Sequence, residues 1–511
     1  MTVERAGRVA VFGAGPLSRD LLLAVARDGA RVVPDDDLDV RLAKGAQRVA
    51  EAVAGEAPVY GVNTGFGALA DKHIGPDDAR ELQAALLRSH AAGSGDPLPR
   101  AVVRAVMAIR AATLARGFSG ARPELVRAII ALLNADLVPV VPELGSLGAS
   151  GDLAPLAHTF ITLMGEGRFL DGRSLADAGL EPLLPAPKEG LALTNGTDAM
   201  LAAGVLVSAE MRTLLRTCDI AAALSVEALL GTDRAFGAEI NALRPHPGQQ
   251  ASAANLRALL GGSGIVSSHR ASHHAVQDAY SLRCTPQVHG ACRDLATFAD
   301  DVFGRELESL IDNPVVFPDT GDVVSAGNFH GEPLAFAHDM LAIAMAELAA
   351  ISERRLNRLL DPKLSRGLPA FLSPREGINS GLMLAQYTAG ALLTDLRLNA
   401  QPASIHNVST SGGQEDHVSM GWTAARQAMA SVDLAFRAVA VELMAGCEAL
   451  ERRAPLRPGP ATAAVLRVVR DRVAPLREDR ELAPDLAAVA ELARSGEVVA
   501  AAETATSGPL L

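Results

Sequence analysis

The chain has 511 residues and a formal net charge of −12, with 49% hydrophobic, 21% charged and 3% aromatic residues. This length and apolar content exclude a wholly disordered chain and allow more than one domain. The acidic balance argues against nonspecific binding to nucleic acid or to an anionic membrane. Because aromatic residues are so few, the core must consist of Ala, Leu and Val, which favours a mainly α-helical protein.

The N-terminal region contains part of a dinucleotide-binding fingerprint. Gly13 and Gly15 follow an apolar run at residues 9–12, but Ser18 stands where a third glycine is required. The next candidate strand is interrupted by Pro34. We therefore expect a surface turn before a helix, and a nucleotide-binding protein remains an alternative.

No targeting or membrane signal stands out in the sequence. Arg19 and Asp20 interrupt the first apolar run ahead of any signal-peptide cleavage site. The longest uncharged stretch, residues 377–394, contains polar residues and glycines, as a buried helix does. The four cysteines form neither a CxxC metal pattern nor a dense disulfide framework. A cytoplasmic protein without a membrane partner is expected.

Helices alternate with glycine-rich loops over the first 200 residues. Residues 99–117 predict a helix that ends at a glycine, and Pro123 suits the first turn of the next helix. Two prolines then force an extended exit into the loop 145–152. Asp152 is placed to cap a further helix that reaches residue 162.

Beyond residue 200 the pattern becomes long and helical. Apolar residues recur at helical spacing within 341–360, and residues 220–230 and 424–450 show the same pattern. Little strand signal lies between these stretches. We therefore predict an N-terminal active-site domain over residues 1–200 and a long helical bundle with a helical tail over residues 201–511.

The loop 145–152, with the sequence GSLGASGD, is the centre of the functional interpretation. Its Ala-Ser-Gly is a common loop tripeptide when considered alone. Seven further polar or glycine-rich motifs accompany it along the chain. They are residues 60–67 (YGVNTGFG), 89–93 (SHAAG), 195–197 (NGT), 277–283 (QDAYSLR), 312–314 (DNP), 327–330 (GNFH) and 414–420 (QEDHVSM).

This series of motifs resembles the histidine/phenylalanine ammonia-lyase family, most closely its histidine-specific members, over nearly the whole chain. The resemblance implies a mainly α, aspartase/fumarase-like fold and a homotetramer with shared active sites. It also implies that Ala149, Ser150 and Gly151 cyclise into a methylidene-imidazolone (MIO) electrophile without an external cofactor. These residue types suit that chemistry, because Gly151 N must approach the Ala149 carbonyl closely and Ser150 supplies the hydroxyl that is lost.

The resemblance assigns the remaining catalytic roles by position. Tyr60 would be the base that removes the β-proton of the substrate. Its ordinary pKa of about 10 requires a cationic or dipolar neighbourhood for action near neutrality. Asn195 and Tyr280 would hydrogen-bond the MIO ring or the substrate amine.

Five residues are assigned to substrate binding in the same way. Arg283 would hold the substrate carboxylate with its planar fork of donors, assisted by Gln277, and Phe329 would wall the pocket. His90 and Glu415 would form a polar site that suits an imidazole and leaves buried groups unpaired against a phenyl ring. The expected reaction is therefore the conversion of L-histidine to trans-urocanate and ammonia.

Three alternatives stay open. The first is an ammonia-lyase or aminomutase that acts on phenylalanine or tyrosine, the second is the nucleotide-binding protein, and the third is a noncatalytic helical scaffold. The intact Ala-Ser-Gly tripeptide and Tyr60 argue against the scaffold. The histidines, including His273 and His274, show no metal-binding spacing, so no metal is expected. The expected partners are a small amino-acid substrate and further copies of the chain, with no nucleic acid.

Overall fold

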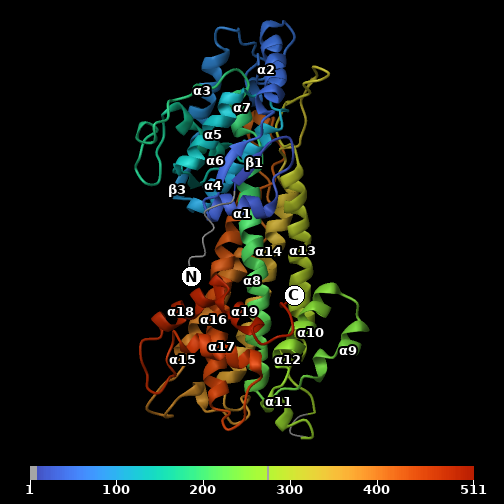
Figure 1. The fold of residues 1–511 in the computed structure, drawn as a ribbon, viewed down its shortest axis with the longest axis vertical. Helices are drawn as coiled ribbons and strands as arrows, with labels where there is room; N and C mark the ends of the chain where they lie inside the picture. Colours follow the sequence, from blue (N-terminus) through green and yellow to red (C-terminus); the bar gives the residue numbers. More distant parts are fainter. Residues whose placement is uncertain (1–8, 273–275) are drawn as a thin grey trace. The chain divides into compact units, whose positions relative to one another are not determined.

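The computed structural model describes residues 9–272 and 276–511, so His273 and His274 lie outside the described residues. Helices make up most of this part of the chain, and its sheets are short and two-stranded (Figure 1). The predicted mainly α-helical fold class is confirmed. The buried side chains are predominantly Ala, Leu and Val, as the composition required.

The chain divides into two compact units. The predicted boundary at residue 200 lies close to the end of the first segment of unit 1, but unit 1 also takes two later segments of the predicted bundle. Unit 1 comprises Met1–Leu206, Asp300–His338 and Pro402–Arg426, and unit 2 comprises Val207–Ala299, Asp339–Gln401 and Gln427–Leu511.

Unit 1 begins with a strand–helix–strand element that contains the expected turn and helix. Strands β1 (Val9–Phe12) and β2 (Arg31–Pro34) pair in parallel, and α1 (Arg19–Arg27) connects them. Pro34 takes the last register position of β2, opposite Phe12. A two-stranded sheet leaves each strand with a free edge, so a proline without an N–H is tolerated there. The expected surface turn before a helix is confirmed, since the mostly exposed residues 13–18 lie between β1 and α1, whereas the two strands were not expected.

This element leaves no room for a nucleotide beside its glycines. Asp35, which follows β2, forms an ion pair with Arg41 at 2.8 Å. The space lined by Gly15 and Arg116 measures about 10 Å³. Small-molecule sites are usually larger than about 300 Å³.

Two helices of unit 1 follow their sequence signals closely. Helix α4 (Arg100–Ala115) ends just before Gly117, and α5 (Pro123–Ala135) has its proline in the first turn. The remaining helices of unit 1 are α2 (Leu38–Ala54), α3 (Ala79–His90), α6 (Leu153–Phe160) and α7 (Glu189–Thr194). Antiparallel pairs are formed by β3 (Ser94–Pro97) with β4 (Pro142–Leu144) and by β5 (Val315–Val316) with β6 (Val323–Val324).

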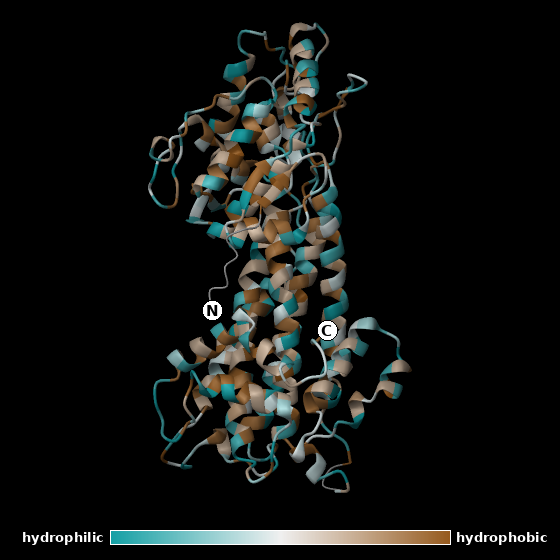
Figure 2. Ribbon diagram, in the orientation of Figure 1, coloured by the Kyte–Doolittle hydropathy of each residue, from teal (hydrophilic) through white to brown (hydrophobic). Residues whose placement is uncertain are grey.

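Four long helices contain residues of both units: α8 (Asp198–Ala228), α13 (Thr285–Glu308), α14 (Glu332–Leu360) and α16 (Gly421–Glu451). In Figure 2 hydrophobic and hydrophilic residues are interspersed along them. Helix α14 is long and apolar enough to cross a membrane by length and composition alone, yet 72% of its most apolar window is buried within the protein. Such burial is typical of a core helix in a soluble protein.

Shorter helices complete the described chain. In unit 2 they are α9 (Ala238–Ala242), α10 (Pro247–Leu260), α11 (Gly264–Ser268), α12 (Tyr280–Arg283), α15 (Met383–Asn399), α17 (Pro460–Arg470), α18 (Ala483–Ser495) and α19 (Glu497–Glu503). Single turns of 3-10 helix occur at Gly67–Leu69, Ile161–Met164, Ala176–Ala178, Arg234–Phe236, Ala370–Leu372 and Ser411–Gly413.

Candidate active site

A cavity of about 420 Å³ in unit 1 brings together motifs that lie far apart in the sequence. Its volume suits a small molecule such as an amino acid. Five of the predicted site residues line it: Tyr60, Ala149, Ser150, Phe329 and Glu415. The other lining residues are Gly67, Ala70, Gly148, Asn313, Ser325, Ala326, His330, Gln414, Asp416, His417 and Val418.

The glycine-rich loop is folded into a tight turn around Ser150. The N–H of Gly151 donates to the carbonyl of Gly148 at 3.3 Å. Ser150 and Gly151 both have positive φ angles, +47° and +84°. A Cβ atom on Gly151 would lie 2.1 Å from the backbone oxygen of Gly196, so no residue with a side chain fits this position.

Asp152 lies at the N-cap position of α6, as predicted, but its carboxylate caps another helix. Its Oδ2 accepts the N–H groups of Ala199 (2.8 Å) and Met200 (2.9 Å) in the first turn of α8. The backbone N–H of Asp152 donates to the carbonyl of Gly196 at 2.7 Å, which holds the two helix starts together. The expected side-chain cap of α6 was therefore wrong. Both N-termini direct their positive dipole ends at the loop.

Burial has a strong effect on Asp152. The side chain is fully buried, and burial raises its pKa to about 8, against the two hydrogen bonds from the start of α8. Within the described residues, Oδ1 has no hydrogen-bond partner. Asp152 is therefore mainly protonated at neutral pH, directly beside the Ser150–Gly151 turn. The sequence by itself indicates only a capping role for Asp152.

Asn195 directly follows α7 and is held from one side. Its Nδ2 donates to the backbone carbonyl of Asn313 at 2.8 Å. The neighbouring Asp312 forms a buried ion pair with Lys188 at 2.7 Å, a contact for which the sequence gave no signal. In the described part of the chain, the buried Oδ1 of Asn195 has no partner. A buried acceptor without a donor is costly, which fits a site that receives a donor from a ligand.

Tyr60 is partly buried and accepts the N–H of Gly67 on its Oη at 3.1 Å. Burial raises the pKa of Tyr60, the hydrogen bond from Gly67 lowers it, and the charge of Glu415 raises it further. The described lining residues include no lysine or arginine. These residues therefore provide no lysine or arginine that would lower the pKa of Tyr60.

His90 and Glu415 are close enough to influence each other electrostatically. Burial lowers the pKa of His90, while the charge of Glu415 acts in the opposite direction. The Oγ of Ser89 lies 3.0 Å from His90 Nδ1, and Thr410 Oγ1 donates to Glu415 Oε2 at 2.8 Å. Glu415 lines the cavity, whereas His90 is outside its lining.

Three side chains of unit 1 have a metal-ligating composition that sequence spacing did not reveal. Ligand atoms of His330, Glu332 and His417 all lie within 4.8 Å of one another. The His330 Nε2 is already 3.2 Å from the carbonyl of His417, and the two rings stack with 5.8 Å between their centres. These contacts join the 327–330 and 414–420 motifs at the cavity wall.

Three predicted site residues, Gln277, Tyr280 and Arg283, belong to unit 2 and do not line the cavity. Gln277 is exposed on the loop before α12, and Tyr280 is 72% exposed. The Nε of Arg283 donates to the carbonyl of Asp278 at 2.8 Å. Its guanidinium carbon lies 4.7 Å from the centre of the Tyr280 ring.

Comparisons with known proteins agree over nearly the whole chain. The sequence profile of the family described as aromatic amino acid lyase matches residues 17–471. The histidine ammonia-lyase of Streptomyces coelicolor is 50% identical over 510 residues, which cover 98% of this chain and 99% of that protein.

Solved structures give the same agreement. The crystal structure of histidine ammonia-lyase from Trypanosoma cruzi matches with a TM-score of 0.89 at 39% identity, covering 98% of this chain and 96% of that chain. Tyrosine aminomutase from Streptomyces globisporus matches with a TM-score of 0.92 at 36% identity, covering 99% and 100%.

Proposed function

Since this chain belongs to the aromatic amino acid lyase family, we propose that it is a carbon–nitrogen lyase that eliminates ammonia from L-histidine and yields trans-urocanate. The observation that carries the proposal is the single cavity lined by Tyr60, the Ala149–Ser150 turn and Glu415. The near-complete match to histidine ammonia-lyases supports histidine as the substrate. A cytoplasmic location fits the four cysteines, all of which are free.

The turn at residues 149–151 fits the formation of MIO. The Gly148–Gly151 hydrogen bond already closes the chain on itself, and Gly196 excludes any side chain at position 151. When formed, this group supplies an electron-poor alkene, an electrophile that ordinary side chains lack. Mass spectrometry of the peptide that contains Ser150 tests the proposal. A mass lower than the coded one by two water molecules is expected, and an unmodified peptide in active protein would contradict it.

The residues of the candidate site then each perform one step of the reaction. Tyr60 Oη takes the β-proton of the substrate, the C–H electron pair forms the new double bond, and the Cα–N pair leaves with the amine. The free Oδ1 of Asn195 accepts a hydrogen bond from the amine. Glu415 accepts a hydrogen bond from the imidazole. Tyr60 must lose its own proton first, and burial opposes this loss by raising its pKa.

We infer that a partner subunit supplies the missing cation. Gln277, Tyr280 and Arg283 belong to unit 2, outside the cavity, and the exposure of Tyr280 suits a site completed by another copy. A homotetramer with shared active sites, which the family resemblance implies, accords with this proposal. Mixing inactive Tyr60→Phe and Arg283→Ala subunits tests it, because random assembly would restore about a quarter of the sites if two chains contribute. If one chain contributes both residues, no activity returns.

The decisive assay is the ultraviolet absorbance of urocanate, with phenylalanine and tyrosine offered separately. Turnover of histidine well above that of either competitor is expected. An aminomutase acting on tyrosine is the second candidate, because the tyrosine aminomutase structure matches this chain over its full length. Formation of β-tyrosine in place of urocanate would support that candidate and overturn the proposal.

A further inference from the structure

The loop that carries Tyr280 and Arg283 is anchored by one buried acid, Asp278. Its neighbours Gln277 and Tyr280 are exposed, whereas Asp278 is only 7% exposed. A carboxylate in this position needs partners for both oxygens. Oδ2 accepts the backbone N–H of Thr232 at 2.7 Å, and Oδ1 pairs with Nη2 of Arg366 at 2.9 Å.

Arg366 connects this acid to the end of a long helix. Its Nη1 donates to the carbonyls of Leu229, at 2.8 Å, and of Leu230, just beyond α8. The backbone of Arg366 is fixed in turn, because Arg453 donates to its carbonyl at 3.0 Å. The carboxylate of Asp278 is therefore held by a hydrogen-bonded network within unit 2.

The backbone carbonyl of Asp278 faces the other way and holds Arg283. It accepts Nε of Arg283 at 2.8 Å, and the guanidinium lies over the ring of Tyr280. In the described part of the chain, no hydrogen bond is recorded for the two Nη groups of Arg283. An arginine held through Nε still offers the Nη groups to a carboxylate.

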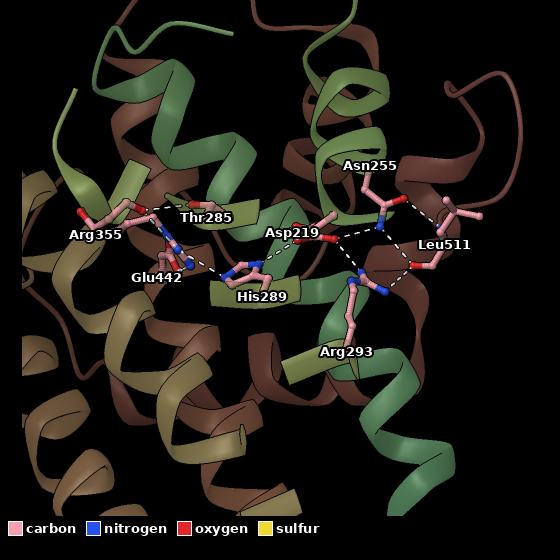
Figure 3. Close-up of polar contacts among 10 residues, drawn as sticks. Asp219, Asn255, Thr285, His289, Arg293, Arg355, Glu442 and Leu511 are labelled. Atoms are coloured by element: carbon pink, nitrogen blue, oxygen red, sulfur yellow. Dashed lines mark hydrogen bonds and ion pairs between the residues drawn. The ribbon is translucent and has the colours of Figure 1, made fainter. Parts of the chain in front are cut away.

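A second buried group contacts α12 through the carbonyl of its second residue, Ser281. The carbonyl of Ser281 accepts Thr285 Oγ1 at 3.1 Å and lies 3.5 Å from Nη1 of Arg355. Arg355 is itself paired with Glu442, with Nη2 donating at 2.8 Å (Figure 3). The short helix is thus held at two points, and the contact with Asp278 is the one that sets the direction of Arg283.

We propose that Asp278, clamped by Arg366, is a positioning residue that presents Arg283 and Tyr280 as a preformed pair for the substrate carboxylate. The inference rests on the proposed function, since it takes Arg283 as the carboxylate ligand. Asp278 does not touch the substrate and acts through Arg283. Any α-amino acid substrate carries the same carboxylate, so the role is independent of the ring that the enzyme selects.

The test uses Asp278→Asn in the full-length protein and two competitive ligands. One, 3-(imidazol-4-yl)propionate, carries the carboxylate, and the other, histamine, lacks it. The variant should bind the propionate about 10-fold to 100-fold more weakly than the parent, because Arg283 no longer points its charged group at the carboxylate. The KM for histidine should rise by the same factor. Histamine inhibition should change less than about twofold. Equal losses for both ligands, or none, would overturn the positioning role.

Glu448→Gln is a matched control in the same unit. Glu448 is also buried, accepts one backbone N–H, from Leu476 at 2.9 Å, and pairs with one arginine, Arg470, at 2.8 Å. Its removal should lower the melting temperature but change the affinities for the two ligands by the same factor. If Glu448→Gln separates them as Asp278→Asn does, the effect is general destabilisation and the proposal fails.

A second variant keeps the proposal testable if Asp278→Asn does not fold. Arg366→Lys keeps the positive charge but loses the two-armed guanidinium that joins Asp278 to the end of α8. It should therefore also weaken binding of the propionate much more than binding of histamine. Equal effects on the two ligands would overturn the proposal. Failure of the proposed function can be distinguished from failure of the positioning role of Asp278. If the unmutated protein prefers phenylalanine, 3-phenylpropionate and phenethylamine replace the two imidazole ligands, and Asp278 is tested unchanged.

Discussion

Two buried carboxylates, one in each unit, illustrate how the same residue type serves opposite purposes. Asp219 in unit 2 accepts bonds from Asn255 (2.8 Å), His289 (2.7 Å) and Arg293 (2.6 Å), as Figure 3 shows. It also accepts a bond from Ser252 (2.7 Å). Burial opposes its ionisation, but Arg293 and His289 outweigh burial and hold the pKa of Asp219 well below its ordinary value.

Asp152 in unit 1 has fewer partners and the opposite behaviour. It accepts two backbone N–H groups on one oxygen, and burial raises its pKa to about 8. Asn195, next to the Gly196 whose carbonyl accepts the N–H of Asp152, likewise leaves one buried oxygen without a partner among the described residues. The Asp219 carboxylate, with both oxygens paired, stabilises the fold, whereas the unpaired Oδ1 atoms of Asp152 and Asn195 leave capacity for chemistry. The following predictions test this contrast, starting from the largest effect.

Ser150→Ala should remove turnover entirely and leave the fold intact. The variant lacks the hydroxyl that becomes the methylene of the electrophile, while the turn keeps its glycine at position 151. Urocanate absorbance should stay at background, and the loop peptide should keep its coded mass. A variant that deaminates histidine at a measurable fraction of the parent rate would show that the cavity works without this group.

Tyr60→Phe should lower kcat by about 10²- to 10⁴-fold, because the proton acceptor alone is removed. KM should change little, since the ring still walls the cavity. In the parent protein, burial raises the pKa of Tyr60, so activity should increase with pH as the phenolate forms. The pH profile of kcat in the variant should lose this rise. A profile identical to that of the parent would assign the base to another residue.

Asp219→Asn should destabilise the protein by about 3–5 kcal/mol, because it leaves Arg293 largely buried without its counter-charge. The loss should be full at neutral pH. An acid with a lowered pKa contributes stability above the unfolded value of about 4 and loses it as the pH falls further. Denaturant unfolding at pH 7 and at a pH well below 4 measures both effects. Equal stability of parent and variant at pH 7 would remove the structural role of the network.

Glu415→Gln and His90→Leu should each cost about 2–4 kcal/mol of transition-state binding, or roughly 30- to 1,000-fold in kcat/KM for histidine. Each change should also narrow the preference for histidine over phenylalanine, since an apolar ring then strands no buried charge. MIO formation should be normal in both, as the peptide mass shows. Parent-level histidine turnover in both variants would refute this account of specificity.

Asp152→Asn should have the smallest effect on stability near pH 4, where the carboxyl is protonated in the folded parent, because a protonated carboxyl and an amide are nearly isosteric. The parent keeps a proton on Asp152 up to about pH 8 in the folded state, and the unfolded chain releases it near pH 4. This contribution is full below about pH 4 and is lost as the pH rises towards 8. Melting temperatures from pH 5 to 8 should therefore fall less in the variant. A parallel decline would mean that Asp152 is ionised.

Much of the fold and site could be predicted from local pattern. Helices α4 and α5, and the helical stretches now within α8, α14 and α16, follow from periodicity, glycine and proline, which act over a few residues. The family resemblance followed from the order of the motifs, and the family profile confirms it. The roles given to individual site residues remain predictions, although five of them line one cavity.

The contacts between distant segments could not be predicted. Asp152 was expected to cap α6, yet its carboxylate caps α8. The start of α8 lies more than 40 residues away along the chain, so only the folded structure brings it to Asp152. Pro34 was expected to break a strand, yet it ends one, because a two-stranded sheet leaves its N–H side free. The roles of Lys188 and Arg366 depend on partners more than 80 residues away, Asp312 and Asp278.

By itself, the sequence determined the helical class, the position of the Ala-Ser-Gly turn and the family, because composition, periodicity and motif order are properties of the chain. The tertiary structure decided which groups are satisfied and which are left open. That distinction depends on burial and on partners from remote segments, which set the pKa of Asp152 and Asp219 in opposite directions. Two aspartates that look alike in the sequence therefore differ in charge once the chain is folded.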